Sequence, residues 1–352
     1  MVARTAAERA TVAIVGVADD DPTMRPLAAL IVLAACGAGT PVEPEEPKRD
    51  PKEAIREARG LIDEAYRSLR SGDVVGLQPI LAPDLFFVGP GPADVGLDRS
   101  AALALGQEHV DDRQKHKLKS YNLEVFAGPN GRSAYAIDQL EFDGTAFAVT
   151  VVAAEVGDMW MITTIAISRA VSAKRLDSAA VLAELPAWRP STTEDEPAHA
   201  KAPRQLVEAL TLAASDLDAR LTQYGKDPDA AYVGPSPDEV ILGTKALGKK
   251  WKKRAPAWEI DASLGGATSD ERLVWVLANA RDAARPAKDD RDRDDRDDRD
   301  DRDRRRRRDD DEADAAEPPA AAPRRLFAIY RDDGGEAGWR LAVLHAAVAL
   351  AR

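Results

Sequence analysis

The sequence predicts an α+β fold that occurs twice along the chain. The first observation is an internal repeat, in which Pro83–Val95 returns as Pro228–Val240, shifted by 145 residues without a gap. The second is the order of patterns within each copy, where helical periodicity comes first and strand-like segments follow. An internal repeat of this kind indicates two copies of one domain, and helices followed by a strand meander indicate an α+β arrangement.

Length and composition limit the possible classes of protein. A chain of 352 residues has room for two or three domains, and 44% hydrophobic residues suffice for two ordinary cores. The net charge of −12 gives no electrostatic reason to expect nucleic acid as a partner. The single cysteine, Cys36, excludes an internal disulfide.

The N-terminal residues 1–36 have the pattern of an export signal. Met24-Arg25-Pro26 precedes a short apolar run that ends in Leu33-Ala34-Ala35-Cys36, and the run is too short to span a bilayer. These last four residues resemble the bacterial lipobox, which implies that Cys36 is acylated. Residues 1–23 fit a signal poorly, with Asp19-Asp20-Asp21 shortly before Met24, so we expect translation to begin at Met24. The alternative is a buried helix with an incidental thiol.

The lipobox resemblance also implies a location. The residue after Cys36 is Gly37 rather than Asp. By resemblance to sorted lipoproteins, this residue favours the outer membrane of the cell envelope. Residues 37–52 are rich in Pro and Glu and are predicted to form a flexible tether.

The first copy is predicted to occupy residues 53–170. Apolar residues at helical spacing predict a helix over Glu53–Arg70, which Gly72 ends, and a short helix over Val74–Leu81. Ser100 is expected to cap a helix that continues to about Asp111. Strands are expected at Leu85–Val88, Leu118–Phe126, Ser133–Phe142, Ala146–Val156 and Met159–Ser168.

This organisation resembles a known family. The phrase L-x-P-D-x-x-F-V-G-P at residues 81–90, with a long first helix before it and a last strand that begins at Trp160, resembles a SnoaL-like domain of the nuclear transport factor 2-like superfamily. The resemblance implies a cone-shaped domain, in which helices pack in a curved antiparallel sheet and an apolar pocket opens at one end.

The second copy is predicted to occupy residues 203–352. Its helical stripe begins near Leu206, Thr244 is expected to cap a short helix, and strands over Trp258–Leu264 and Glu271–Ala280 are expected to pair across Gly265-Gly266. An insertion at 285–323, dominated by alternating Asp and Arg, is predicted to be a disordered, solvated loop. Residues 171–202 form the interdomain linker.

Asp138 is the one candidate for catalysis. It shares a strand face with Ala134 and Ala136, so it could act as a general base if that face lines a pocket. By resemblance, relatives such as polyketide cyclases and ketosteroid isomerases use a pocket Asp in this way. Ala278 takes its place in the second copy, and the alternative is an outward, solvated position.

Metal and cofactor sites have little support. A helix continuing through His109, Asp112 and His116 would place potential metal ligands on one face, but several Lys and Arg crowd the segment, so an ordinary solvated helix end is the simpler interpretation. Asp94 and Glu239 are the acid shared by both repeats, and backbone capping of a turn explains them. Phosphate loops and nucleophile elbows are absent from the sequence, and we expect no cofactor.

Aromatic side chains are the remaining candidates for a ligand site. They are expected to form the cores or to line an apolar pocket, and they comprise Tyr66, Phe87, Tyr135, Trp160, Tyr232, Trp275 and Trp339. The duplicated chain lacks a shared polar constellation, which favours a non-catalytic module for a small apolar ligand or an envelope protein. The alternative is an isomerase, cyclase or hydrolase in the first domain. The open sheet faces could also pair with each other.

Overall fold

The computed structural model describes residues 48–91, 94–110, 114–171, 204–237, 239–252, 256–283, 323–334 and 338–348. Cys36 and the signal region, residues 37–47 of the tether, and nearly all of the linker and insertion lie outside these described residues. Within the described ranges, no helix combines the length and apolar character needed to cross a membrane.

The long helix α2 (Pro51–Ser71) begins and ends where local chemistry dictates. Asp50 caps its N-terminus by accepting a hydrogen bond from the Lys52 N–H at 2.9 Å. Gly72 ends it at φ 69°, a left-handed conformation that glycine adopts without strain. Ala54, Ala58, Ile62 and Tyr66 form the buried stripe that lies against one face of the first sheet.

The first half forms a seven-stranded sheet with the order β2-β1-β7-β6-β5-β3, and β4 also pairs with β5. After the 3₁₀ helix η1 (Val75–Ile80) and the helix α3 (Arg99–His109), the long strands form an antiparallel meander. The strands are β1 (Leu81–Val88), β2 (Val95–Gly96), β3 (Leu118–Ser120), β4 (Glu124–Ala127), β5 (Ser133–Phe142), β6 (Thr145–Val156) and β7 (Met159–Arg169).

The second half repeats this plan with a six-stranded sheet of order β10-β11-β12-β13-β8-β9. Its helices are α5 (Arg204–Ser215), α6 (Leu217–Tyr224) and α7 (Thr244–Trp251). Its strands are β8 (Ala231–Val233), β9 (Val240–Leu242), β10 (Trp258–Ala267), β11 (Leu273–Asp282), β12 (Pro323–Asp332) and β13 (Trp339–Val348).

The repeated sequence phrase forms the same structure in both halves. In each copy it contributes to a strand that pairs in parallel with the last strand of the meander, β1 with β7 and β8 with β13. A tight turn follows, in which the N–H of Gly89 bonds the carbonyl of Asp94 at 2.7 Å and that of Gly234 bonds Glu239 at 2.8 Å. The Asp94 carboxylate also accepts the Gly91 N–H, so its capping role is structural.

Several predicted boundaries were wrong, each for a local reason. The cap of α3 is Asp98, not Ser100, and Thr244 donates its hydroxyl to the Asp227 carbonyl instead of capping α7. The strand predicted over residues 118–126 is interrupted between β3 and β4, where the Tyr121 N–H bonds the Gln139 carbonyl. The glycines at 265 and 266 lie inside β10, and the hairpin turns instead at residues 268–272.

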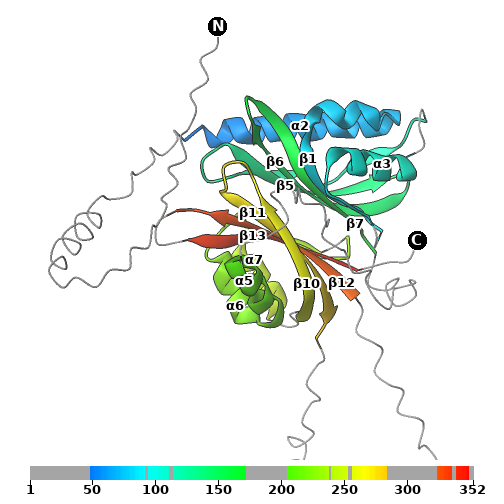
Figure 1. Ribbon diagram of the computed structural model, residues 1–352. Coiled ribbons are helices and arrows are strands. Elements are labelled where there is room, and N and C mark those ends of the chain that lie inside the picture. Colours follow the sequence, from blue (N-terminus) through cyan, green and yellow to red (C-terminus); the bar gives the residue numbers. More distant parts are fainter. Residues whose placement is uncertain are drawn as a thin grey trace, which may run out of the picture. The chain divides into compact units, whose positions relative to one another are not determined.

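The predicted fold class is confirmed. Each half packs its helices on one face of a sheet whose long strands are antiparallel, and the repeat adds a parallel strand at one side. Figure 1 shows α2 and α3 on one side of the paired sheets, and α5, α6 and α7 on the other. The face of each sheet that its own helices leave open therefore faces the other sheet.

Candidate functional site

The two sheets meet along a buried surface that we call the seam. One continuous apolar cluster joins Phe86, Val88 and Tyr135 of the first half to Trp275, Phe327 and Val343 of the second, together with further members from both sheets. At its centre the rings of Phe86 and Trp275 stack with centroids 3.8 Å apart and planes 14° from parallel. Stacked aromatic pairs add attraction beyond the area that they bury.

Polar groups also cross the seam, and His345 is one of them. It lies on β13 with 2% of its surface exposed. Its Nδ1 lies 3.0 Å from the Thr150 hydroxyl of β6, and its Nε2 lies 2.7 Å from the Ser168 hydroxyl of β7. Burial lowers the pKa of His345 to about 4, because charge is costly to bury.

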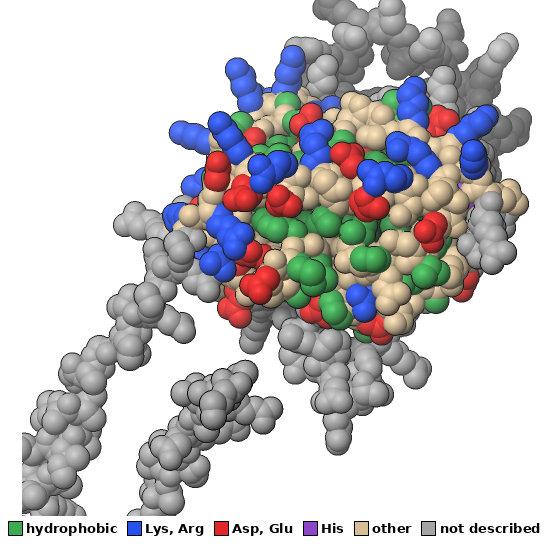
Figure 2. Space-filling model, turned by 90° about the horizontal axis from the view of Figure 1, so that it is seen from above, with side chains coloured by type: hydrophobic (Ala, Val, Ile, Leu, Met, Phe, Trp, Pro, Cys, Tyr) green, Lys and Arg blue, Asp and Glu red, His purple; other side chains and the backbone are tan. Residues whose placement is uncertain are grey.

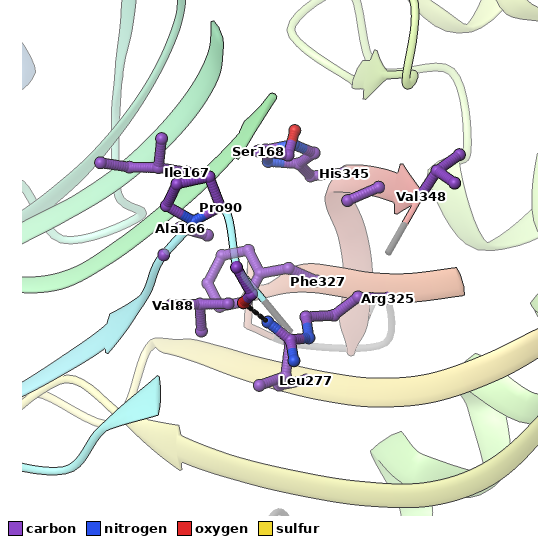
Figure 3. Close-up of a pocket in the computed structure, with 13 residues that line it drawn as sticks. Val88, Pro90, Ala166, Ile167, Ser168, Leu277, Arg325, Phe327, His345 and Val348 are labelled. Atoms are coloured by element: carbon purple, nitrogen blue, oxygen red, sulfur yellow. Dashed lines mark hydrogen bonds between the residues drawn. The ribbon is translucent and has the colours of Figure 1, made fainter. Parts of the chain in front are cut away.

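A small cavity opens beside His345 at one end of the seam. Val88 and the Gly89–Gly91 turn line it from the first half, and Phe327, Arg325 and His345 line it from the second (Figure 3). Its volume of about 20 Å³ is enough for about one water molecule. A drug-sized ligand requires a pocket of roughly 300–1,000 Å³.

Arg325 joins the turn of the repeat to the second half. Its guanidinium donates to the Gly91 carbonyl at 3.2 Å, drawn as a dashed line in Figure 3. Burial lowers the pKa of Arg325 to about 10, and the nearby Asp94 carboxylate acts in the opposite direction. Arg325 therefore stays cationic at neutral pH and fixes the position of the repeat's turn.

Asp138 lies in the core of the first half, so the expectation of an outward, solvated position was wrong. It is 2% exposed and shares the helix-covered face of the sheet with Ala134 and Ala136. The Tyr66 hydroxyl donates to its Oδ2 at 2.8 Å and the Asn122 N–H donates to its Oδ1 at 3.2 Å. Burial, and then the Asp138 carboxylate, raises the pKa of Tyr66, so this hydroxyl stays protonated.

The aromatic candidates are divided among three apolar clusters rather than gathered in one site. Tyr135 and Trp275 lie in the seam. The others pack in the two helix-covered cores: Tyr66, Phe87 and Trp160 in the first half, and Tyr232 and Trp339 in the second.

The histidines weighed as metal ligands do not converge. Helix α3 ends at His109, whose Nε2 lies 3.1 Å from the Asp94 carboxylate. His116 lies beyond the helix, with its Nδ1 2.6 Å from Asp143, and Asp112 is outside the described residues. Among the residues that the structure describes, no group of three or more His, Cys, Asp or Glu side chains is arranged to hold a metal ion.

Arg220 is a buried cation in the second half that sequence reasoning missed. It donates to the carbonyls of Ala213, Ala214 and Pro256 at 2.6–2.8 Å, and the first two lie at the C-terminal end of α5. The rings of Trp251 and Trp258 lie 5.0 and 4.6 Å from its guanidinium carbon. A cation at a helix C-terminus stabilises the negative end of the helix dipole, so Arg220 has a structural role.

The sequence holds only weak signals for Arg220 and His345, which sequence reasoning missed. Arg220 and His345 each interrupt an apolar periodic segment, which is a reason to examine a polar residue. His345 also pairs with Val233 in the register that Ala166 has with Val88 in the first half, so the two copies differ there. Aligning the last strands of the two copies would have shown His345 at the position that Ala166 holds in the first copy.

The fold defines this chain as an α+β protein built from two similar halves, each with helices on one face of a mainly antiparallel sheet. No family model matches the chain. No curated protein matches it either.

Solved structures of similar type were found at low sequence identity. An NTF2-like protein of unknown function from Pseudomonas putida KT2440 is 20% identical, and the match covers 34% of this chain and 89% of that one with a TM-score of 0.30. A protein with a cystatin-like fold from Caulobacter vibrioides is 15% identical over 36% of this chain and 95% of that one, with a TM-score of 0.31. An NTF-2 like protein from Silicibacter pomeroyi DSS-3 is 17% identical over 34% and 97%, with a TM-score of 0.26.

Proposed function

We propose that this chain is a non-catalytic interaction module of the cell envelope, held at the outer membrane by an acylated Cys36, and that its partner is another envelope protein. The observation that carries the non-catalytic part is the state of Asp138. Both of its oxygens accept hydrogen bonds from the protein itself, from Tyr66 and Asn122. A general base must also be within reach of its substrate, and only 2% of Asp138 is exposed.

Two features favour a protein partner over a small ligand. The sheet faces that could line a large pocket bury each other in the seam, whose cavity is about 20 Å³. Large apolar side chains are exposed elsewhere on the first half, with Val75 at 54% and Met159 at 60%. Figure 2 shows hydrophobic side chains gathered between rows of charged ones on the face seen from above, which is typical of an interaction surface.

Cys36 carries the envelope part of the proposal and is tested by intact mass. The native protein, extracted from membranes, is expected to begin at Cys36 and to carry acyl chains, because multiple chains are needed for stable anchoring. Cys36→Ser is expected to appear in the soluble fraction at the mass of an unacylated chain. An unmodified native mass beginning at Met1 would overturn the anchor.

The interaction is tested by photo-crosslinking in intact cells. The full chain carrying p-benzoylphenylalanine in place of Met159 or Val75 is expected to give one adduct of defined protein mass. Leu212, exposed at 55% in the second half, is the matched control position. A chain that forms no protein adduct at either test position and retains a small molecule through purification would contradict the proposal.

The Tyr66–Asp138 pair keeps an enzyme of isomerase, cyclase or hydrolase type as a second candidate. A buried carboxylate with a polar partner at 2.8 Å is an arrangement that general bases also use. Asp138→Asn distinguishes the two, because it retains the local shape while removing the base. Photo-adduct formation that persists in Asp138→Asn supports the module, whereas a turnover that this variant abolishes would support the enzyme.

A further inference from the structure

His345 is held entirely by neutral partners from the opposite half of the chain. A neutral imidazole has one donor and one acceptor nitrogen, and hydroxyl groups can serve either one. Thr150 and Ser168, at 3.0 and 2.7 Å, therefore satisfy both nitrogens of the uncharged ring. The same hydroxyls supply no negative charge to an imidazolium.

The elements packed around His345 are mostly apolar. The first half presents Val88 and the Gly89–Gly91 turn of the repeat, Thr150 from β6, and Ala166 and Ser168 from β7. The second half presents Val233 from β8, and Phe327 and Arg325 from β12. Arg325 is the one charged side chain among the described residues that line the adjoining cavity, and it is a cation.

The carboxylate of Asp94 belongs to the turn of the repeat and is engaged there. It accepts the Gly91 N–H at 2.7 Å, lies 3.1 Å from the His109 ring and acts on Arg325. An imidazolium at His345 would therefore lie in an apolar seam beside a guanidinium, and the described residues of the surrounding strands place no anion against it. A buried charge without a partner is strongly unfavourable.

We propose that the seam is a pH-sensitive contact, in which protonation of His345 separates the two sheet faces and exposes the apolar surfaces between them. The chain would then hold two states, with the halves docked at neutral pH and undocked in acid. A water-sized cavity adjoins the ring. This inference stands apart from the proposed partner and from the membrane anchor.

The direction and size of the effect follow from linkage. The pKa of His345 is about 4 in the docked state, and an exposed histidine has a pKa of about 6.5. The undocked state therefore binds more protons between these values, so docking is fully favourable above about pH 6.5 and weakens as the pH falls toward 4. The shift in the docking equilibrium is about 30-fold at pH 5 and about 160-fold at pH 4, and it approaches about 300-fold at still lower pH.

The test measures dye binding and secondary structure together, on the full chain, between pH 7.5 and 4. A dye that fluoresces on exposed apolar surface is expected to bind the wild-type chain increasingly below about pH 6, while far-UV circular dichroism stays constant. His345→Gln is expected to remove this rise, because an amide can bond both hydroxyls but cannot take up a proton. His116→Gln, outside the seam, is the matched control and is expected to behave as the wild type.

An equal rise in dye binding for all three proteins would overturn the proposal. If His345→Gln does not fold, NMR titration of the wild-type ring decides. A His345 pKa near 4, with loss of seam contacts as the ring titrates, supports the inference. A pKa near 6.5, or a ring that titrates while the Phe86–Trp275 contact persists, would refute it.

Discussion

The Phe86–Trp275 stack gives a quantitative test of whether the two halves pack as described. The rings belong to different halves, are almost fully buried and lie 3.8 Å apart. Truncation of either to alanine would cost about 3–5 kcal/mol, a large part of a total stability of about 5–15 kcal/mol. Leucine is the better replacement, because it retains most of the apolar volume while removing the stacked ring. The double-mutant cycle of Phe86→Leu and Trp275→Leu should then show a coupling of about 0.5–1.5 kcal/mol.

Urea denaturation of the wild type, both single variants and the double variant measures that coupling. The control cycle uses Tyr232 and Trp251, whose rings meet edge to face at 5.1 Å within the second half. That pair should be coupled whether or not the halves dock. Coupling in the control together with additivity within about 0.3 kcal/mol for the seam pair would refute the packing of the two sheets.

Five further substitutions test local features of the structure through the free energy of unfolding. Tyr66→Phe should lower the free energy of unfolding by about 1–3 kcal/mol, because it leaves the buried Asp138 oxygen without its donor. Asp138→Asn should lower it by less. Equal losses for the two variants would contradict this account. Arg220→Met should cost about 3 kcal/mol or more, since three carbonyls lose their donor, and a neutral result would show that those carbonyls find other partners. Gly131→Ala should destabilise by about 1–3 kcal/mol because φ is +72° and a Cβ would lie 2.5 Å from a carbonyl oxygen. Gly60→Ala, in open space on α2, should instead stabilise by about 0.5–1 kcal/mol, and thermal melts of the two alanine variants check their opposite signs.

Local chemistry in the sequence determined the elements and their repetition. The spacing from Ala54 to Tyr66 predicted α2, and Gly72 predicted its end, because a helix stripe and a left-handed cap depend on neighbouring residues alone. The repeated phrase predicted two copies of one fold for the same reason. Strand alternation also placed Ala134, Ala136 and Asp138 on one face, as the structure has them.

The tertiary structure alone decided which faces are covered and what meets across them. Strand alternation cannot show whether a face meets water or another element. The face that carries Asp138 is covered by the helix that carries Tyr66, 72 residues earlier in the chain. The parallel pairing of β1 with β7 joins segments separated by the whole meander. His345 meets Thr150 and Ser168 only because two sheets, each with one face left open by its own helices, bury those faces against each other. Such contacts depend on how the two sheets dock, and no local pattern in the sequence encodes that geometry.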